Sequence, residues 1–211
     1  RRREVSLVFN AIDSVEGLTE ILNILSEYNI RSTFFLNGEF MRRNPEAVEE
    51  LSLSGHEIGS MFYIYFNMTD AKFKIDEEFI KRGLARNEDD YFLLTGKELS
   101  LLWHSPYYFV NSNIIKASSS MDYVYIGRDV DPMDWVPLSD CPEDSMYLST
   151  MDIIENIMVE KKQGSIIPVR IGQTVRGRDD YLFQNLDLLI NGLLSQGYDI
   201  VPVTTLREHV Q

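Results

Sequence analysis

The chain has 211 residues, a formal net charge of −13, one cysteine and three histidines. This length suits one domain, a hydrophobic content of 44% is enough for a core, and no apolar run is long enough for a transmembrane helix. His56, His104 and His209 lie far apart, which excludes a zinc site built from two closely spaced histidines. The single Cys141 excludes an internal disulfide and a CxxC motif.

The acidic balance argues against nucleic acid as a partner. The positive residues are scattered apart from Arg1, Arg2 and Arg3, and removing these three from the 20 Lys and Arg leaves 17 against 33 Asp and Glu. Phosphate binding needs clustered positive side chains. The chain does not begin with Met, which indicates a processed or excised segment and leaves the compartment open.

Strand-like and helix-like segments alternate along the chain. Runs of buried, β-branched or aromatic residues predict strands, and apolar residues at helical spacing predict helices. In chain order we expect strand 5–9, helix 18–28, strand 32–36, helix 45–55, strand 56–62, helix 70–95 with a break, strand 99–105, helix 111–120, strand 123–126, helix 151–161, strand 165–171, helix 182–193 and strand 200–204.

Capping residues support several of these boundaries. Asn44 is expected to cap the helix that starts at Pro45, and Gly55 suits its left-handed end. Asp179 or Asp180 could cap the helix 182–193, which Gly197 could end. About seven β-then-α units predict a parallel sheet or barrel with helices outside. The irregular segment 129–148 has a length often associated with function.

One block of the sequence resembles a known family. Residues 33–59 read TFFLNGEFMRRNPEAVEELSLSGHEIG, which closely resembles the polysaccharide deacetylases, also called the NodB homology domain or carbohydrate esterase family 4. Weaker matches follow in the right order and spacing, and they are SLVFNAID at residues 6–13, TGK at 95–97, DPMDW at 131–135, GSII at 164–167 and GYD at 197–199.

The resemblance implies an α/β fold, a distorted (β/α) barrel of about seven parallel strands, with residues 1–211 as one domain. The site of such a barrel lies at the C-terminal ends of the strands. Active members hold a divalent metal, often zinc, with one Asp and two His, while a second Asp acts as general base and another His as general acid. Many members are exported, which favours a periplasmic or cell-surface location.

The residues at these positions differ from the metal ligands and proton-transfer groups that the family's reaction needs. The base aspartate aligns with Asn10 and the metal aspartate with Ala11, and the two metal histidines align with Met61 and Tyr65. Asn cannot take a proton, Ala offers no ligand, and a thioether or a neutral phenol is a poor zinc ligand. We therefore expect no zinc or other divalent metal. A slipped alignment would bring Asp13 into play but would not restore the two histidines.

Two further positions are replaced as well. An Arg of the family aligns with His104, and the general-acid His aligns with Arg170, which stays protonated. We therefore expect no catalytic residues. His104 is either a neutral side chain that fills the space of the Arg or a pH-sensitive group that contacts a substrate.

Asp131, Asp134 and Trp135, in contrast, match the corresponding residues of the family motif. The resemblance implies that an Asp of this motif orients the acid and that the Trp lines the acetyl pocket, whereas the alternative is a core Trp beside two turn-capping Asp. Arg170 could pair with either carboxylate and keep the local charge balanced.

The apolar segment 61–66 and the aromatic residues 107–109 could simply fill an emptied metal cavity. They could instead form an aromatic platform for a sugar or a partner side chain. The candidate binding residues are Tyr65, His104, Tyr107, Asp131, Asp134, Trp135 and Arg170.

Three functions remain open. The first is a degenerate deacetylase domain without metal or hydrolysis that binds a glycan or has a structural role. The second is an active metal-dependent deacetylase or hydrolase of acetylated glycans with a relocated site around His104, Asp131, Asp134 and Asp13, which bound metal would indicate. The third is a regulatory domain that binds a protein partner through an outer surface, which a filled barrel mouth would favour.

Overall fold

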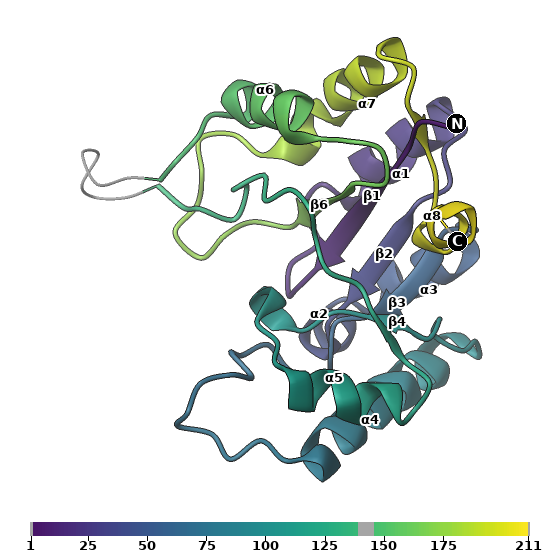
Figure 1. The fold of residues 1–211 in the computed structure, drawn as a ribbon, viewed down its shortest axis with the longest axis vertical. Coiled ribbons are helices and arrows are strands. Elements are labelled where there is room, and N and C mark those ends of the chain that lie inside the picture. Colours follow the sequence, from purple (N-terminus) through teal and green to yellow (C-terminus); the bar gives the residue numbers. More distant parts are fainter. Residues whose placement is uncertain (1, 139–145, 211) are drawn as a thin grey trace. The chain divides into compact units, whose positions relative to one another are not determined.

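Strands and helices alternate along the chain in the computed structural model, which describes residues 2–138 and 146–210 (Figure 1). The contacts divide the chain into two compact units. Unit 1 comprises residues 1–10, 15–33 and 128–211, and unit 2 comprises residues 11–14 and 34–127. Cys141 and part of the segment 129–148 lie outside the described residues.

Unit 1 contains all but the last residue of β1 (Glu4–Ala11), a strand whose residues are all buried. Burial on both faces is typical of a parallel strand and explains the unbroken apolar run at 5–9. β7 (Asp199–Ile200) pairs in parallel with β1, with Glu4 opposite Asp199, and β6 (Ile166–Ile171) is also a neighbour of β1.

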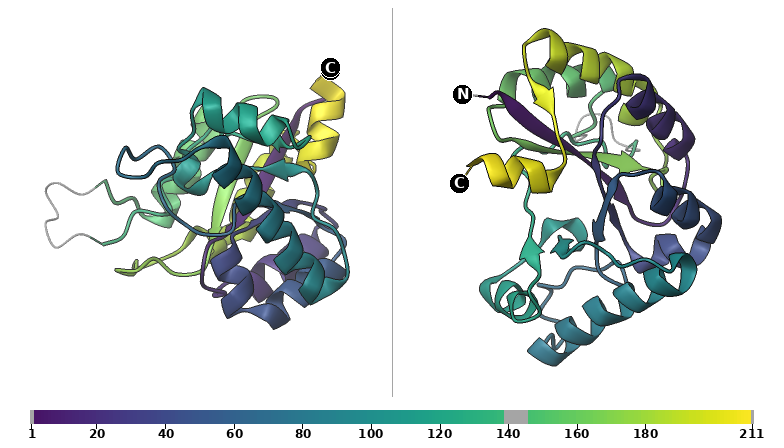
Figure 2. Two further views of the ribbon diagram at one scale, coloured as in Figure 1. Left: turned by 90° about the horizontal axis from the view of Figure 1, so that it is seen from below. Right: turned by 90° about the vertical axis from the view of Figure 1, so that its right-hand side faces the viewer.

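The helices of unit 1 are α1 (Leu18–Glu27), α6 (Thr150–Glu160), the short 3₁₀ helix η3 (Leu182–Asn185), α7 (Leu186–Ser195) and α8 (Val203–Val210). α8 runs beside the first residues of β1 (Figure 2). Among the described residues, no helix combines the length and the apolar character needed to cross a membrane.

Unit 2 contains four strands in the order β2–β3–β4–β5, of which β3 with β4 and β4 with β5 are parallel pairs. The strands are β2 (Thr33–Leu36, from Phe34 onward in this unit), β3 (Glu57–Ser60), β4 (Leu102–Trp103) and β5 (Val124–Tyr125). The helices are α2 (Gly38–Arg43), α3 (Pro45–Leu53), α4 (Glu77–Thr95), the 3₁₀ helix η1 (Pro106–Tyr108) and α5 (Ser112–Ser119).

The α/β class and the alternation of elements are confirmed. All seven predicted strands are present in the described residues, although several are shorter than expected, and α2 was not predicted. Gly55 and Gly197 have the expected positive φ values of 79° and 78°.

The predicted strand 200–204 is wrong beyond Ile200, because α8 begins at Val203. The first turn of α8 closes when the backbone N–H of Leu206 donates to the carbonyl of Pro202 at 3.0 Å. The N–H of Val203 donates to Thr33 Oγ1 at 3.0 Å, a contact that the local pattern of β-branched residues does not reveal.

The helix predicted over 70–95 begins only at Glu77. Asp76 caps it by accepting a hydrogen bond from the N–H of Phe79 at 2.8 Å. Before it, Asn67 and Asp70 each accept a hydrogen bond from a backbone N–H two residues later, which favours turns over helix.

Two predicted caps are also wrong. Asn44 stands at the start of α3, but its side-chain amide donates to the carbonyl of Asp13 at 3.0 Å and makes no capping hydrogen bond. Asp180 accepts from the N–H of Thr150 at 2.9 Å, and the helix expected at 182–193 begins with the 3₁₀ turn η3.

Candidate functional site

Three positions that the resemblance assigns to metal ligands lie in unit 2. Ala11 ends β1 and Met61 follows β3, and both side chains are buried. Tyr65 is partly buried, and its ring lies 4.4 Å from the ring of Tyr107. An alkyl group, a thioether and a phenol do not match the donors that zinc uses in proteins. The residues at these positions therefore do not fit the metal of the family.

Other side chains that could hold a metal do not gather in the described residues. Across residues 2–138 and 146–210, no three His, Cys, Asp or Glu side chains come together as a possible metal site. Asp13, which a slipped alignment would involve, forms an ion pair with Arg43 at 3.5 Å. The ring of His56 lies 5.1 Å from that of Phe34.

One buried asparagine holds the segment 61–65 in position and a second bonds to the last residues of β2 and β3, and the sequence reasoning missed both. The amide of Asn37 donates to the carbonyl oxygens of Met61 at 2.9 Å and Ile64 at 3.0 Å. The amide of Asn87, on α4, donates to the carbonyl oxygen of Leu36 at 3.1 Å and to Ser60 Oγ at 2.9 Å. An Asn directly after a predicted strand is a local signal for Asn37, whereas nothing near Asn87 marks it.

Phe62 anchors the same segment in the core of unit 2. Its side chain is fully buried, and its ring lies 6.0 Å from that of Phe79 and 6.4 Å from that of Trp103. Its φ of 69° places its backbone in the left-handed region, which non-glycine residues rarely adopt. Packing therefore outweighs a local backbone preference at this position.

Aromatic side chains also reach the surface of unit 2. We define the aromatic surface as Tyr65, Tyr107 and Phe109. The ring of Tyr107 lies 6.0 Å from that of Phe109, and these two residues are 50% and 49% exposed. Tyr107 and Tyr108 have φ values of 57° and 61°, so the backbone that presents these rings is strained.

His104 is buried between two rings. Its imidazole stacks on Tyr108 at 4.0 Å with an angle of 6° between the planes, and it meets the edge of Phe35 at 4.8 Å. Its Nδ1 lies 2.9 Å from the carbonyl oxygen of Ser105, and because a carbonyl only accepts, Nδ1 carries a proton.

The remaining predicted site residues belong to unit 1. Asp134 is buried, and its Oδ2 accepts a hydrogen bond from the backbone N–H of Arg170 at 2.7 Å. Burial raises the pKa of Asp134 to about 6, although that hydrogen bond and the charges of Arg170 and Arg178 act in the opposite direction. The guanidinium of Arg170 donates to the carbonyl of Gln173 at 3.1 Å.

Asp131 organises a turn. Its Oδ1 accepts from the N–H of Met133 and from Nε1 of Trp135, both at 3.0 Å, and its Oδ2 lies 3.0 Å from Nη2 of Arg128. Arg128 therefore forms an ion pair with Asp131 that the sequence reasoning did not predict. Trp135 is 43% exposed, so it is not a core residue. Asn10, the last residue of unit 1 on β1, is buried.

Arg178 was missed by the sequence reasoning. Its side chain is completely buried and donates to the carbonyl oxygens of Val136, Leu148 at 2.6 Å and Asp180 at 2.9 Å. It thereby joins the two described ends of the segment 129–148.

The chain is similar to proteins of one family. The family model described as polysaccharide deacetylase matches residues 1–126. A peptidoglycan-N-acetylglucosamine deacetylase of Bacillus cereus is 27% identical over 138 residues, 65% of this chain and 48% of the relative. A second relative of that name from the same species is 27% identical over 195 residues, 90% of this chain and 81% of the relative.

A solved structure supports the same fold. A CE4 family pseudoenzyme from Bacillus anthracis has a TM-score of 0.81 and 21% identity, and the match covers 98% of this chain and 66% of that one. This likeness confirms the predicted distorted (β/α) barrel of NodB type. The chain spans about half the length of the first relative. Because the family model covers more than half of the chain, this protein belongs to the polysaccharide deacetylase family.

Proposed function

We propose that residues 1–211 form one polysaccharide-deacetylase-type domain that lacks the metal site and the hydrolytic activity and that binds a glycan. The observation that carries the proposal is the set of side chains at the three ligand positions, Ala11, Met61 and Tyr65. Two of the three are buried, and the third lies against another aromatic ring. An alkyl group, a thioether and a neutral phenol offer neither the anionic oxygen nor the imidazole nitrogen that zinc needs.

The positions for proton transfer support the same proposal. The amide of Asn10 has no basic lone pair at neutral pH, and the guanidinium of Arg170 stays protonated. A general base and a general acid are both needed to hydrolyse an acetamide. Neither position provides the required group.

The aromatic surface of unit 2 supports glycan binding. The exposed faces of Tyr107 and Phe109 can stack against the C–H groups of a pyranose ring, and the backbone that presents Tyr107 is strained. The two Bacillus cereus relatives are named as peptidoglycan-N-acetylglucosamine deacetylases. We therefore propose a glycan of N-acetylated amino sugars as the ligand and an extracytoplasmic location.

Metal content and acetate release test the loss of activity. The purified chain is incubated with Zn²⁺, dialysed and analysed for metal, and it is then assayed for acetate release from N-acetylglucosamine oligomers and from peptidoglycan. We expect less than one tenth of an equivalent of metal and no acetate. One equivalent of bound zinc, or acetate release above a heat-treated control, would overturn the proposal.

A variant that restores the family residues serves as the matched control. Asn10→Asp, Ala11→Asp, Met61→His, Tyr65→His and Arg170→His together provide the ligands and proton-transfer groups that the resemblance implies. This variant is expected to bind zinc where the unchanged chain does not. Binding of the unchanged chain to the same oligomers is measured by calorimetry, and its absence would remove the glycan part of the proposal.

The second candidate is an active hydrolase with a relocated site. One observation favours it: the pKa of Asp134 is raised to about 6, close to the range of a general base. Acetate release that is lost in Asp134→Asn would select this candidate.

A further inference from the structure

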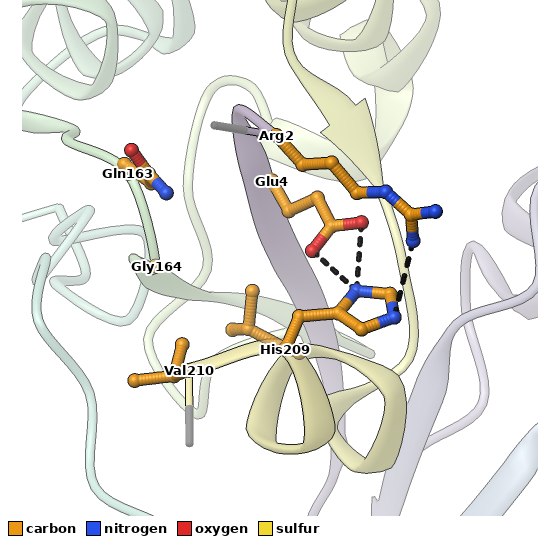
Figure 3. Close-up of a pocket in the computed structure, with 7 residues that line it drawn as sticks. Arg2, Glu4, Gln163, Gly164, His209 and Val210 are labelled. Atoms are coloured by element: carbon orange, nitrogen blue, oxygen red, sulfur yellow. Dashed lines mark hydrogen bonds and ion pairs between the residues drawn. The ribbon is translucent and has the colours of Figure 1, made fainter.

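A cavity of about 780 Å³ lies in unit 1 at the beginning of β1, and the proposed function uses none of the residues that line it (Figure 3). Its lining residues come from β1, the segment before it, the turn before β6, and α8. They are Arg2, Glu4, Gln163, Gly164, Leu206, His209 and Val210.

Three ionisable groups meet on the wall of this cavity. Nδ1 of His209 lies 2.7 Å and 3.0 Å from the two carboxylate oxygens of Glu4, and Nε2 of the same ring lies 3.2 Å from Nη1 of Arg2 (Figure 3). Arg2 and His209 are 207 positions apart in the sequence. The imidazole therefore connects α8 both to β1 and to the residue that leads into it.

The partners decide the protonation state of this ring. A guanidinium can only donate hydrogen bonds, so Nε2 of His209 must accept from Arg2 and cannot carry a proton. Nδ1 then carries the proton of the neutral ring and donates it to Glu4. These contacts match a neutral imidazole with its proton on Nδ1, in which both ring nitrogens are used.

Other charged groups lie nearby. Asp199 stands opposite Glu4 in the sheet, and Arg207 and Glu208 precede His209 on α8. The Glu4 side chain is only 7% exposed, whereas that of His209 is 33% exposed and so can exchange protons with water. Protonation of His209 would strengthen its attraction to Glu4 and remove its ability to accept a hydrogen bond from Arg2.

We propose that His209 is a pH-sensitive latch that holds Arg2 against the cavity when it is neutral and releases Arg2 when it is protonated. Protonation converts Nε2 from an acceptor into a donor and places two positive groups where one hydrogen bond stood. Glu4 retains His209 through an ion pair, so α8 stays beside β1 while Arg2 leaves the cavity wall.

Nuclear magnetic resonance of the 211-residue chain tests the latch. The ¹⁵N shifts of the His209 ring report its tautomer at pH 8, and relaxation of Nε in Arg2 reports the order of that side chain at pH 8 and pH 5. We expect a neutral ring protonated at Nδ1 and an ordered Arg2 at pH 8. At pH 5 we expect a doubly protonated ring and loss of order in Arg2.

His209→Gln is the matched variant. A Gln side chain can donate to Glu4 through its amide nitrogen and accept from Arg2 through its oxygen, and it does not titrate. Arg2 should therefore keep the same order at pH 8 and pH 5 in this variant. A neutral ring protonated at Nε2, an Arg2 equally ordered at both pH values in the unchanged chain, or the same loss of order in His209→Gln would each overturn the proposal.

Discussion

The residues at the family's site positions have different surroundings in the two units. In unit 2, Met61 is buried and the ring of Tyr65 lies against that of Tyr107, so side-chain packing dominates. In unit 1, Asp131 and Asp134 keep their carboxylates, each held by backbone or side-chain donors. Polar groups bonded to several partners are costly to remove, because those partners would be left unpaired. Side-chain packing therefore stabilises the site positions of unit 2, and hydrogen bonding stabilises those of unit 1. The stability of the two regions should respond differently to substitution and to pH.

The largest expected effect concerns the packed region of unit 2. Phe62→Ala should lower the free energy of unfolding by about 3–5 kcal/mol, because it removes a fully buried ring and leaves a cavity. Urea unfolding measures this change. Phe73→Ala is the control, since Phe73 is 49% exposed and should cost roughly 1 kcal/mol or less. Equal losses in the two variants would show that the segment around Phe62 is not a packed core.

The buried carboxyl group of Asp134 in unit 1 should make the free energy of unfolding depend on pH. The pKa of Asp134 is raised from 3.8 to about 6 by burial, so the native state holds this proton to a higher pH than the unfolded chain does. The contribution of Asp134 to the free energy of unfolding should therefore fall as the pH rises from about 4 to about 6, by about 3 kcal/mol in total.

Asp134→Asn removes this ionisation while leaving an oxygen that can accept from the N–H of Arg170. Urea unfolding of both proteins at pH 4, 5, 6 and 7 measures the difference. The unchanged chain should lose stability relative to Asp134→Asn across this range, and parallel profiles would contradict the raised pKa.

A smaller effect is expected at the aromatic surface. Tyr107→Ala should weaken binding of N-acetylglucosamine oligomers roughly tenfold, equivalent to about 1.4 kcal/mol, because one stacking face is lost. Tyr107→Phe keeps the ring and should bind within about twofold of the unchanged chain. Calorimetric titration measures both. If Tyr107→Ala binds as well as the unchanged chain, the surface of unit 2 only packs and does not recognise a glycan.

The smallest effect is expected for the ion pair between Arg43 and Asp13. Arg43 is 62% exposed, and exposed ion pairs contribute little, so Arg43→Ala should change the free energy of unfolding by less than about 1 kcal/mol. Urea unfolding at low and at high salt measures this change. A loss of several kcal/mol would mean that Asp13 belongs to a more strongly coupled polar group than its ion pair indicates.

Local sequence patterns were sufficient for most elements and insufficient for their ends. The apolar run at 5–9 and the helical spacing at 18–28 predicted β1 and α1, because burial and period are local properties. The strand expected at 200–204 was mostly wrong, because a hydrogen bond from Val203 to Thr33 lies at the start of α8. Asn44 looks like a cap in sequence, but its side chain bonds to Asp13, 31 positions away.

The sequence by itself determined which side chains stand at the positions that the resemblance assigns to metal ligands. An alkyl group, a thioether and a phenol at positions 11, 61 and 65 differ from carboxylate and imidazole in any fold, because ligand chemistry belongs to the side chain. Tertiary structure decided which partners the remaining polar groups have. Arg128 pairs with Asp131, burial raises the pKa of Asp134, and His209 contacts Arg2 and Glu4. Burial and long-range hydrogen bonds depend on which distant segments the fold brings together, and no local pattern contains that information.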